Sequence, residues 1–465
     1  RVWGVPLACF VNKNLNNNSD NYILLDKKVN NRILEAFEKE GADAWFAPNA
    51  KQRFLGGVHN PDDYEKIDDI LDVWFDSGST HAFVLRDRKD GSWPADLYLE
   101  GTDQHRGWFH SSLLQSCGTT GRAPYKGVLT HGFTLDENGM KMSKSLGNTV
   151  SPDDVIKQYG ADILRLWVSQ SDYTSDLRIG KEILKGVADS YRRLRNTMRF
   201  MLGSLGNSSD FEQIQLQDLP DLEKWVLSKL KKLDINIREG YKTYSFQTVF
   251  QQLFQFCTVD LSSFYFDIRK DALYCDHISS HVRKSCIFTL EMIFERLVKW
   301  FAPILPFTME EVWMHRQTEN SNTSIHLDDF PKTPNEWTNI ELEEKWNRIR
   351  DIRGYVTLAI EKERQNKNIR SSLEASPVLK LKDKDLFKIL SSVDFSEVCI
   401  TSSIKIEINE DLQLEEALSS DEDIEVSIFK AEGEKCNRCW KYTNSYNHYK
   451  NKIICKRCNE VLNNS

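Results

Sequence analysis

Two cysteine pairs near the end of the chain have the spacing of a metal site. Cys436 and Cys439 are separated by two residues, as are Cys455 and Cys458, and fifteen residues lie between the pairs. Thiolates on two tight turns can complete a tetrahedron around zinc at about 2.3 Å. We therefore predict one structural zinc ion, because four sulfurs leave no position open for catalysis. Two disulfides or an iron centre are the alternatives.

The cysteine pairs lie in a basic and aromatic segment. Between Lys435 and Cys458 there are seven Lys or Arg residues and no Asp or Glu, whereas the whole chain has a formal net charge of -8. Trp440 and Tyr442 add rings on which a base could stack. This contrast in charge predicts a module that faces RNA. The other six cysteines have no motif spacing, and we expect them to be buried free thiols.

A glycine-flanked loop over residues 139–148 carries two lysines, Lys141 and Lys144. Phosphoryl and nucleotidyl transfers need positive charge near the departing pyrophosphate, and a mobile loop can supply it. An isolated pair of lysines is usually a solvated surface feature. The complete pentapeptide Lys-Met-Ser-Lys-Ser favours the catalytic interpretation.

Acidic, amide and imidazole side chains follow a short apolar segment at residues 96–99. We expect a strand there and a helix over residues 106–116, and between them lie Glu100, Asp103, Gln104 and His105. Such groups can bind an ammonium group, a ribose hydroxyl and an adenine edge, and a helix N-terminus favours a phosphate. In the alternative interpretation, Asp103 only caps the helix.

Two further segments complete the expected sheet. Residues 127–133 predict a buried parallel strand, and residues 71–75 predict a strand that leads into a turn of small residues. Strand, turn, helix, strand and phosphate-sized loop follow one another in nucleotide-binding α/β sheets.

The chain of 465 residues is long enough for two to four domains. No apolar run reaches the roughly 20 residues that cross a bilayer. The first residues resemble no signal peptide and open as if inside a domain, so we expect a fragment. Free thiols without a secretory signal favour a reducing, cytoplasmic compartment.

Together these segments resemble the class I aminoacyl-tRNA synthetases, and among them the isoleucyl-tRNA synthetase family. Residues 141–145 are similar to the second signature of the class. Residues 74–79, Trp-Phe-Asp-Ser-Gly-Ser, and 100–109, Glu-Gly-Thr-Asp-Gln-His-Arg-Gly-Trp-Phe, narrow the resemblance to the isoleucyl family. The resemblance covers nearly the whole chain.

The resemblance implies ATP-dependent ligation of L-isoleucine to tRNA(Ile) through an isoleucyl-adenylate, with Mg²⁺ accompanying the ATP. It assigns Lys144 to the ATP phosphates, with Lys141 as its helper. Trp74 and Trp108 would form walls of the aliphatic pocket, and His131 would lie near the nucleotide. The full set of residues that it assigns to the isoleucyl-adenylate is Glu100, Gly101, Asp103, Gln104, Trp108, Trp74 and His131.

The chain departs from the family pattern in a way that bears on activity. The first signature, a His-x-Gly-His tetrapeptide, does not occur in it. The first strands of the sheet and most of the editing insertion are also expected to be missing. We therefore expect the isolated chain neither to activate isoleucine nor to hydrolyse mischarged tRNA. The alternatives are a non-catalytic tRNA-binding protein, or a valyl- or methionyl-tRNA synthetase, which fits residues 103–108 poorly.

Helical periodicity dominates after residue 151. A long helix from about residue 181 has a basic face that predicts contact with tRNA phosphates, formed by Lys185, Arg192, Arg193, Arg195 and Arg199. Further helices are expected at 222–239, 245–266, 281–301, 306–313 and 342–372, and strands at 378–381, 397–401 and 404–408.

The predicted fold class is α/β plus all-α, and we expect a cytoplasmic monomer without membrane contact. The expected domains are the end of the editing insertion with the return to the catalytic domain, 1–70; the second half of a Rossmann-like catalytic domain with the lysine loop, 71–150; a linking domain that contacts the tRNA stem, 151–185; a helical anticodon-binding domain, 186–341; an α+β junction domain, 342–425; and the zinc-binding module, 426–465.

Overall fold

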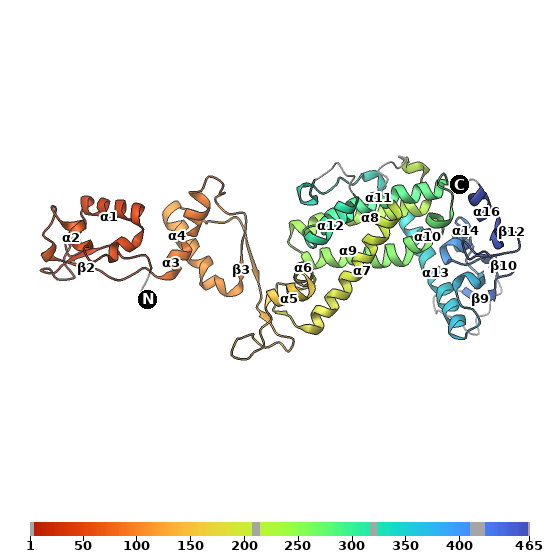
Figure 1. The fold of residues 1–465 in the computed structure, drawn as a ribbon, viewed down its shortest axis with the longest axis horizontal. Coiled ribbons are helices and arrows are strands. Elements are labelled where there is room, and N and C mark those ends of the chain that lie inside the picture. The colour runs from red at the N-terminus through yellow and green to blue at the C-terminus, as the bar shows by residue number, and fades with distance from the viewer. Residues whose placement is uncertain (1–3, 207–213, 317–322, 410–423, 464–465) are drawn as a thin grey trace. The chain divides into compact units, whose positions relative to one another are not determined.

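The computed structural model describes residues 4–206, 214–316, 323–409 and 424–463. Two compact units make up the chain, one formed by residues 1–134 with 173–177 and the other by residues 135–172 with 178–465. The chain passes between the units three times, within the short strands β5 (Thr134–Leu135) and β6 (Leu177–Arg178) and between residues 172 and 173. Figure 1 shows the elements of each unit along the chain.

The first part of unit 1 is a small layer around the fully buried Trp45. β1 (Phe10–Asn12) pairs antiparallel with β2 (Tyr64–Lys66), and α1 (Lys27–Glu40) and α2 (Ala50–Leu55) contribute to the same apolar cluster. Asp26 caps α1 by accepting hydrogen bonds from the amides of Lys28 and Val29 at 2.7 and 3.2 Å. Such a cap satisfies N–H groups that the helix itself leaves unpaired.

The second part of unit 1 contains two parallel strands and two packed helices. β3 (Tyr98–Gly101) pairs with β4 (Val128–His131), and α4 (Trp108–Thr120) connects them and packs on α3 (Val73–Gly78). Two expectations were wrong here. Residues 73–78 form a helix rather than a strand, because Asp72 accepts the amide of Trp74 at 2.8 Å and caps it. β4 is parallel as predicted but not buried, since Val128 is 41% exposed.

Unit 2 is mainly helical. Its first helices are α5 (Pro152–Tyr159), α6 (Ala161–Gln170), α7 (Lys181–Leu205), α8 (Asp221–Lys242), α9 (Phe246–Gln255), α10 (Phe266–Cys275), α11 (His281–Phe301) and α12 (Pro306–Arg316). A π-helix over Phe256–Tyr265 joins α9 to α10, so the helix expected over 245–266 continues further than predicted. The bundle core holds the fully buried Trp225, Trp300 and Tyr265.

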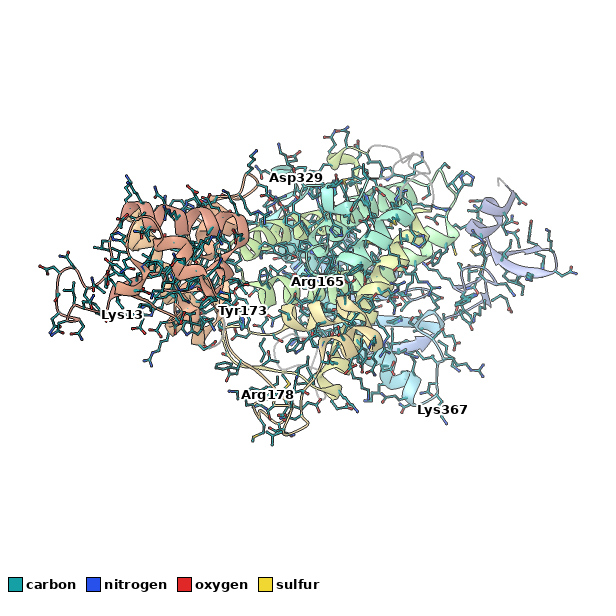
Figure 2. All side chains as sticks on the ribbon, turned by 60° about the vertical axis from the view of Figure 1, so that its left-hand side comes forward. Lys13, Arg165, Tyr173, Arg178, Asp329 and Lys367 are labelled. Atoms are coloured by element: carbon teal, nitrogen blue, oxygen red, sulfur yellow. The ribbon has the colours of Figure 1, made fainter. Side chains whose placement is uncertain are left out.

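The helix α6 is attached directly to the bundle, and α5 packs on α6. Arg165 of α6, labelled in Figure 2, donates to the carbonyl oxygens of Pro303 and Ile304 at 2.6 and 3.3 Å. Asp162 accepts the amide of Thr308 at 2.7 Å in the first turn of α12. These contacts fix the segment after the lysine loop to the helical bundle.

The chain continues into an α+β part. α13 (Ile340–Gln365) packs on a three-stranded sheet of order β8-β7-β9, in which β7 (Ala375–Leu381) pairs parallel with β8 (Lys405–Ile408) and antiparallel with β9 (Ile424–Lys430). Two short helices follow β7, α14 (Lys384–Ser391) and α15 (Phe395–Cys399). The strand expected over 397–401 was wrong, because the Asp394 side chain accepts the amide of Glu397 at 3.0 Å and caps α15.

The last module has four short strands and one helix. β10 (Glu434–Lys435) pairs antiparallel with β11 (Tyr442–Thr443), β12 (Tyr446–Tyr449) pairs antiparallel with β13 (Lys452–Cys455), and α16 (Lys456–Asn463) follows. Across the described ranges, the structure contains no helix with the length and apolar character needed to cross a bilayer.

Candidate functional site

The carboxyl ends of β3 and β4 bring predicted site residues together. The strand pairing places Glu100 beside Thr130 and Gly101 beside His131. A Cβ at Gly101 would lie 2.6 Å from Asp103 Oδ1 and 3.7 Å from Cε1 of His131, so the Asp103 carboxylate can lie there only because the residue is glycine. Two exposed carboxylates and an imidazole thus share the edge of the sheet at which α/β proteins bind ligands.

Gln104 connects this edge to α4. Its Nε2 donates to Asp103 Oδ2 at 3.2 Å, and its Oε1 accepts the amide of Trp108 at 2.9 Å. Gln104 therefore satisfies the first unpaired N–H group of the helix. The interpretation of Asp103 as the helix cap was wrong, because α4 begins at Trp108 and Gln104 makes that contact.

Two tryptophans adjoin the strand end. Trp108 stacks on Tyr98 with ring centroids 4.3 Å apart, and its Nε1 donates to the carbonyl oxygen of Ser77 at 2.9 Å. Trp74 lies next to Gly107, where an added Cβ would lie 2.9 Å from the indole ring. Trp74 is 45% exposed, so a ligand can reach it. Ser77 orients Trp108 through its backbone carbonyl oxygen, a role that no side-chain type in the sequence reveals.

The lysine loop belongs to unit 2, whereas the strand end belongs to unit 1. Lys141 and Lys144 are exposed, and within the described part of the chain neither side chain takes part in a hydrogen bond or ion pair. Both ammonium groups are therefore available to a ligand. That Lys144 and Glu100 bind one ligand stays a prediction.

The four cysteines of the last module converge as predicted. Their Sγ atoms all lie within 4.8 Å of one another, and those of Cys439 and Cys455 are 3.7 Å apart. Sulfurs bound to one tetrahedral zinc at 2.3 Å are separated by about 3.8 Å. Cys436 and Cys458 are fully buried. This geometry and four sulfur donors fit zinc, and no ligand position is left for a substrate.

Among the four thiols, that of Cys439 disfavours its thiolate form on its own. The hydrogen bond with Cys455 is the main reason that the pKa of Cys439 is raised to about 11. A bound divalent cation acts in the opposite direction, because it stabilises thiolates. A divalent cation would therefore balance the negative charge of the four thiolates.

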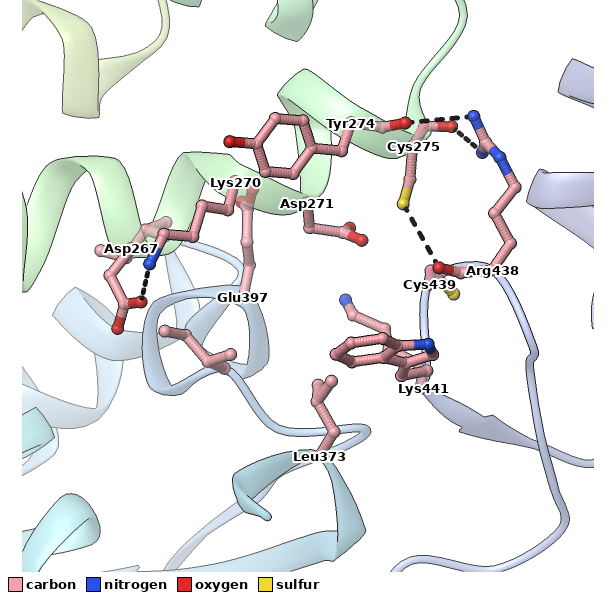
Figure 3. Close-up of a pocket in the computed structure, with 13 residues that line it drawn as sticks. Asp267, Lys270, Asp271, Tyr274, Cys275, Leu373, Glu397, Arg438, Cys439 and Lys441 are labelled. Atoms are coloured by element: carbon pink, nitrogen blue, oxygen red, sulfur yellow. Dashed lines mark hydrogen bonds and ion pairs between the residues drawn. The ribbon is translucent and has the colours of Figure 1, made fainter. Parts of the chain in front are cut away.

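Two arginines inside the cysteine turns attach the module to the helical bundle. Arg438 donates to the carbonyl oxygens of Cys275 and Tyr274 at the end of α10, as the dashed lines in Figure 3 show. Arg457 donates to both carboxylate oxygens of Asp271 at 2.5 and 2.8 Å. The charge of this segment predicted an RNA-facing module, but these two cations bind the protein itself. An arginine within each Cys-x2-Cys turn was the signal for this contact.

A cavity of about 400 Å³ lies beside this contact, between α10 and the module (Figure 3). Its lining includes the exposed rings of Tyr274 and Trp440 and the side chain of Lys441. The buried Cys275 packs against the four metal-site cysteines from the bundle side. The module and the bundle therefore share one small apolar core.

Two family models match the chain. Residues 1–180 match tRNA synthetases class I (I, L, M and V), and residues 223–379 match the anticodon-binding domain of tRNA ligase. The fold is similar to that of the LeuRS–tRNA–LeuAMS ternary complex of Agrobacterium radiobacter K84, with a TM-score of 0.50 and 17% identity over 61% of this chain and 35% of that chain. The chain is thus homologous to the class I aminoacyl-tRNA synthetases.

Curated relatives narrow the family. The isoleucine–tRNA ligase of Ruegeria pomeroyi is 54% identical over 465 residues, which are 99% of this chain and 48% of that protein. The isoleucine–tRNA ligase of Pelagibacter ubique is 50% identical over 460 residues, 98% of this chain and 48% of that protein. The chain belongs to the isoleucine–tRNA ligase family, and it spans about half the length of the curated relatives that it matches.

Proposed function

We propose that this chain is part of an enzyme that ligates L-isoleucine to tRNA(Ile) with consumption of ATP. The observation that carries the proposal is the 54% identity to an isoleucine–tRNA ligase along 99% of the chain. The isoleucine carboxylate oxygen attacks the α-phosphorus of ATP, the bond to the bridging oxygen breaks, and pyrophosphate leaves. A hydroxyl of the terminal adenosine of tRNA then attacks the carbonyl carbon of the adenylate, and AMP leaves.

The strand end of unit 1 binds the isoleucyl-adenylate. The exposed Glu100 carboxylate can accept hydrogen bonds from an ammonium or hydroxyl group, and Gly101 leaves room for the Asp103 carboxylate beside it. Asp103 and Gln104 lie directly beyond them. Trp74 and Trp108 contact the aliphatic side chain of isoleucine, and His131, across from Gly101, lies near the nucleotide.

The lysine loop acts on the phosphates. Lys144, assisted by Lys141, balances negative charge as pyrophosphate leaves, and both ammonium groups are free to do so. Mg²⁺ accompanies the ATP as part of the substrate.

One zinc ion, held by Cys436, Cys439, Cys455 and Cys458, has a structural role.

The helical bundle and the last module bind tRNA. On the basic face of α7, Arg195 is paired with Glu311 at 2.9 Å and Arg192 with Asp189. Arg193 and Arg199 are exposed and have no ion pair with any described residue, so they are the cations of this face that remain for phosphates. We expect the enzyme to be a cytoplasmic monomer.

Isoleucine-dependent exchange of pyrophosphate into ATP tests the proposal. The natural protein that carries this sequence is expected to catalyse the exchange faster with isoleucine than with valine. The 465 residues alone are expected to be inactive, because they contain no His-x-Gly-His tetrapeptide, and exchange by this chain alone would contradict that expectation. Binding of tRNA by the natural protein without any exchange would support the non-catalytic alternative.

A further inference from the structure

The side chain of Asn148 holds the base of the lysine loop. Its Nδ2 donates to Asp136 Oδ2 at 2.9 Å and to the carbonyl oxygen of Lys141 at 3.3 Å, and its Oδ1 accepts the amide of Ser143 at 2.9 Å. The side-chain amide thus uses its oxygen and donates twice. These bonds join the segment before the loop, the first lysine and the central serine of the loop.

Asp136 extends these hydrogen bonds on the side of the loop that precedes Lys141, and we call the two residues together the bracket of Asp136 and Asn148. Its Oδ1 accepts the amides of Asn138 and Met140 at 3.0 and 2.8 Å. Gly139 closes the turn with φ +79°, a left-handed conformation that favours glycine. The hydrogen bond from Asn148 is the main reason that the pKa of Asp136 lies below its ordinary value. The carboxylate therefore remains an acceptor at neutral pH.

The next residue attaches the turn to the helical bundle. Glu137 Oε1 accepts the amide of Glu182 at 2.8 Å, in the first turn of α7. Gly180 makes room for this contact, since a Cβ there would lie 1.7 Å from Cγ of Glu137. A carboxylate is also favourable at the N-terminus of a helix. The base of the loop is therefore anchored on the long helix α7 of the same unit.

We propose that Asn148 is a positioning residue for the nucleotidyl transfer, an inference that rests on the proposed function. Asn148 fixes the backbone at Lys141 and Ser143, and the amide of Gly147 donates to the carbonyl oxygen of Lys144 at 3.3 Å to close the rest of the loop. The fixed backbone keeps the two ammonium groups at one distance from each other. Neither group is paired, so both can face the triphosphate. Asn148 acts through the lysines, because its own polar atoms are engaged by the protein.

Two substitutions and one control separate this role from a general effect on folding. Asn148→Ala removes all three hydrogen bonds, and Asn148→Asp removes both donated bonds and places a second carboxylate against Asp136. Asn138→Ala is the matched control. Asn138 is an exposed asparagine of the same turn, and its side chain makes no hydrogen bond to any residue that the structure describes.

The substitutions are tested in the natural protein that carries this sequence. In isoleucine-dependent exchange, Asn148→Ala is expected to lower kcat/KM for ATP roughly tenfold or more, Asn148→Asp to lower it further, and both to leave the KM for isoleucine unchanged. Asn138→Ala is expected to match the parent. In the chain of 465 residues, hydrogen exchange of the Ser143 amide is expected to accelerate in Asn148→Ala, because this amide loses its acceptor.

Two results would overturn the positioning role: parent-level kinetics for ATP in Asn148→Ala, or equal losses toward ATP and isoleucine. An unaltered natural protein that catalyses no exchange would overturn the proposed function itself. The two failures are therefore distinguishable by the behaviour of the unaltered protein.

Discussion

At the scale of single residues, polar atoms orient the apolar walls of the candidate site. The Nε1 of Trp108 is bound by the carbonyl oxygen of Ser77 at 2.9 Å and lies 3.3 Å from the hydroxyl of Thr80. Trp93 offers a contrast, because its buried Nε1 has no hydrogen-bond partner among the described residues. Unit 1 thus offers a tryptophan with a bound N–H group, Trp108, and one without, Trp93.

Trp108→Phe should lower the free energy of unfolding of unit 1 by about 1 kcal/mol more than Trp93→Phe does. Both changes shorten a ring, but only the first loses a hydrogen bond and leaves the Ser77 carbonyl oxygen without it. Urea denaturation followed by circular dichroism measures the difference. Equal losses in the two variants would show that the Trp108 hydrogen bond contributes nothing to stability.

At the scale of elements, long helices could be predicted and short ones could not. α8 and α11 repeat apolar residues at helical spacing over about twenty positions, and such a repeat has one interpretation. Residues 71–75 and 397–401 are short apolar runs that fit either a strand or a helix. Asp72 and Asp394 favour a helix because they cap it, and the available signal was an aspartate directly before the first helical residue, Val73 or Phe395.

The candidate site also contains residues that could be predicted from the sequence and residues that could not. The strand-end residues could be named from the sequence because they lie in one stretch, and the four cysteines because metal ligation fixes their spacing. The bracket of Asp136 and Asn148 could not be found that way. It forms between residues twelve positions apart, and only the turn at Gly139 brings them together.

Removal of zinc is expected to release the last module from the bundle. The module has little core apart from its cysteines, and Arg438 and Arg457 reach α10 from the two metal-binding turns. A chelator should therefore accelerate amide hydrogen exchange at residues 271–276, and one equivalent of zinc should restore protection. Protection that survives complete removal of the metal would contradict this account.

The same contact should weaken in acid. Burial opposes ionisation of Asp271, but its pairing with Arg457 outweighs burial and keeps the pKa of this carboxyl group below its ordinary 3.8. A carboxyl group with a lowered pKa stabilises the folded form above its ordinary pKa and loses this effect as the pH falls through the lowered value. The contribution of the Asp271–Arg457 pair to the attachment should thus be constant from neutral pH to about pH 4 and decline below it.

Hydrogen exchange at residues 271–276 across this pH range, corrected for intrinsic rates, measures the attachment. Asp271→Asn should weaken it already at neutral pH, because the neutral amide no longer attracts Arg457. Lys456→Ala is the control, since Lys456 is the exposed neighbour of Arg457 and pairs with no described residue. An acid-independent attachment in the unaltered chain would exclude a role for Asp271.

At the scale of the whole molecule, a buried ion network joins the bundle to the α+β part within unit 2. Arg269 of α10 donates to both oxygens of Glu223 of α8 at 2.7 Å and to Glu397 of α15 at 2.8 Å. Burial opposes the charge of Arg269, yet the carboxylates raise its pKa further above its ordinary value. Burial also raises the pKa of Glu397. Three elements from distant parts of the sequence therefore depend on one guanidinium group.

Glu223→Gln should lower the free energy of unfolding of unit 2 by about 3 kcal/mol, because it leaves a buried guanidinium group with one carboxylate fewer. Glu239→Gln is the matched control on the same helix, since Glu239 is exposed and its side chain pairs with no described residue. Chemical denaturation of the two variants measures the difference. A loss of similar size in both would refute the network's contribution.

We propose that Glu100 at the strand end and Lys144 in the loop serve one nucleotidyl transfer. The most direct measurement is isoleucine-dependent pyrophosphate exchange by the Glu100→Gln and Lys144→Ala variants of the natural protein, with tRNA binding measured in parallel. Each variant should lose about a hundredfold in exchange rate, and tRNA binding should stay at the parent level because the bundle and the zinc module are unaltered. Exchange at the parent rate in either variant would contradict the claim.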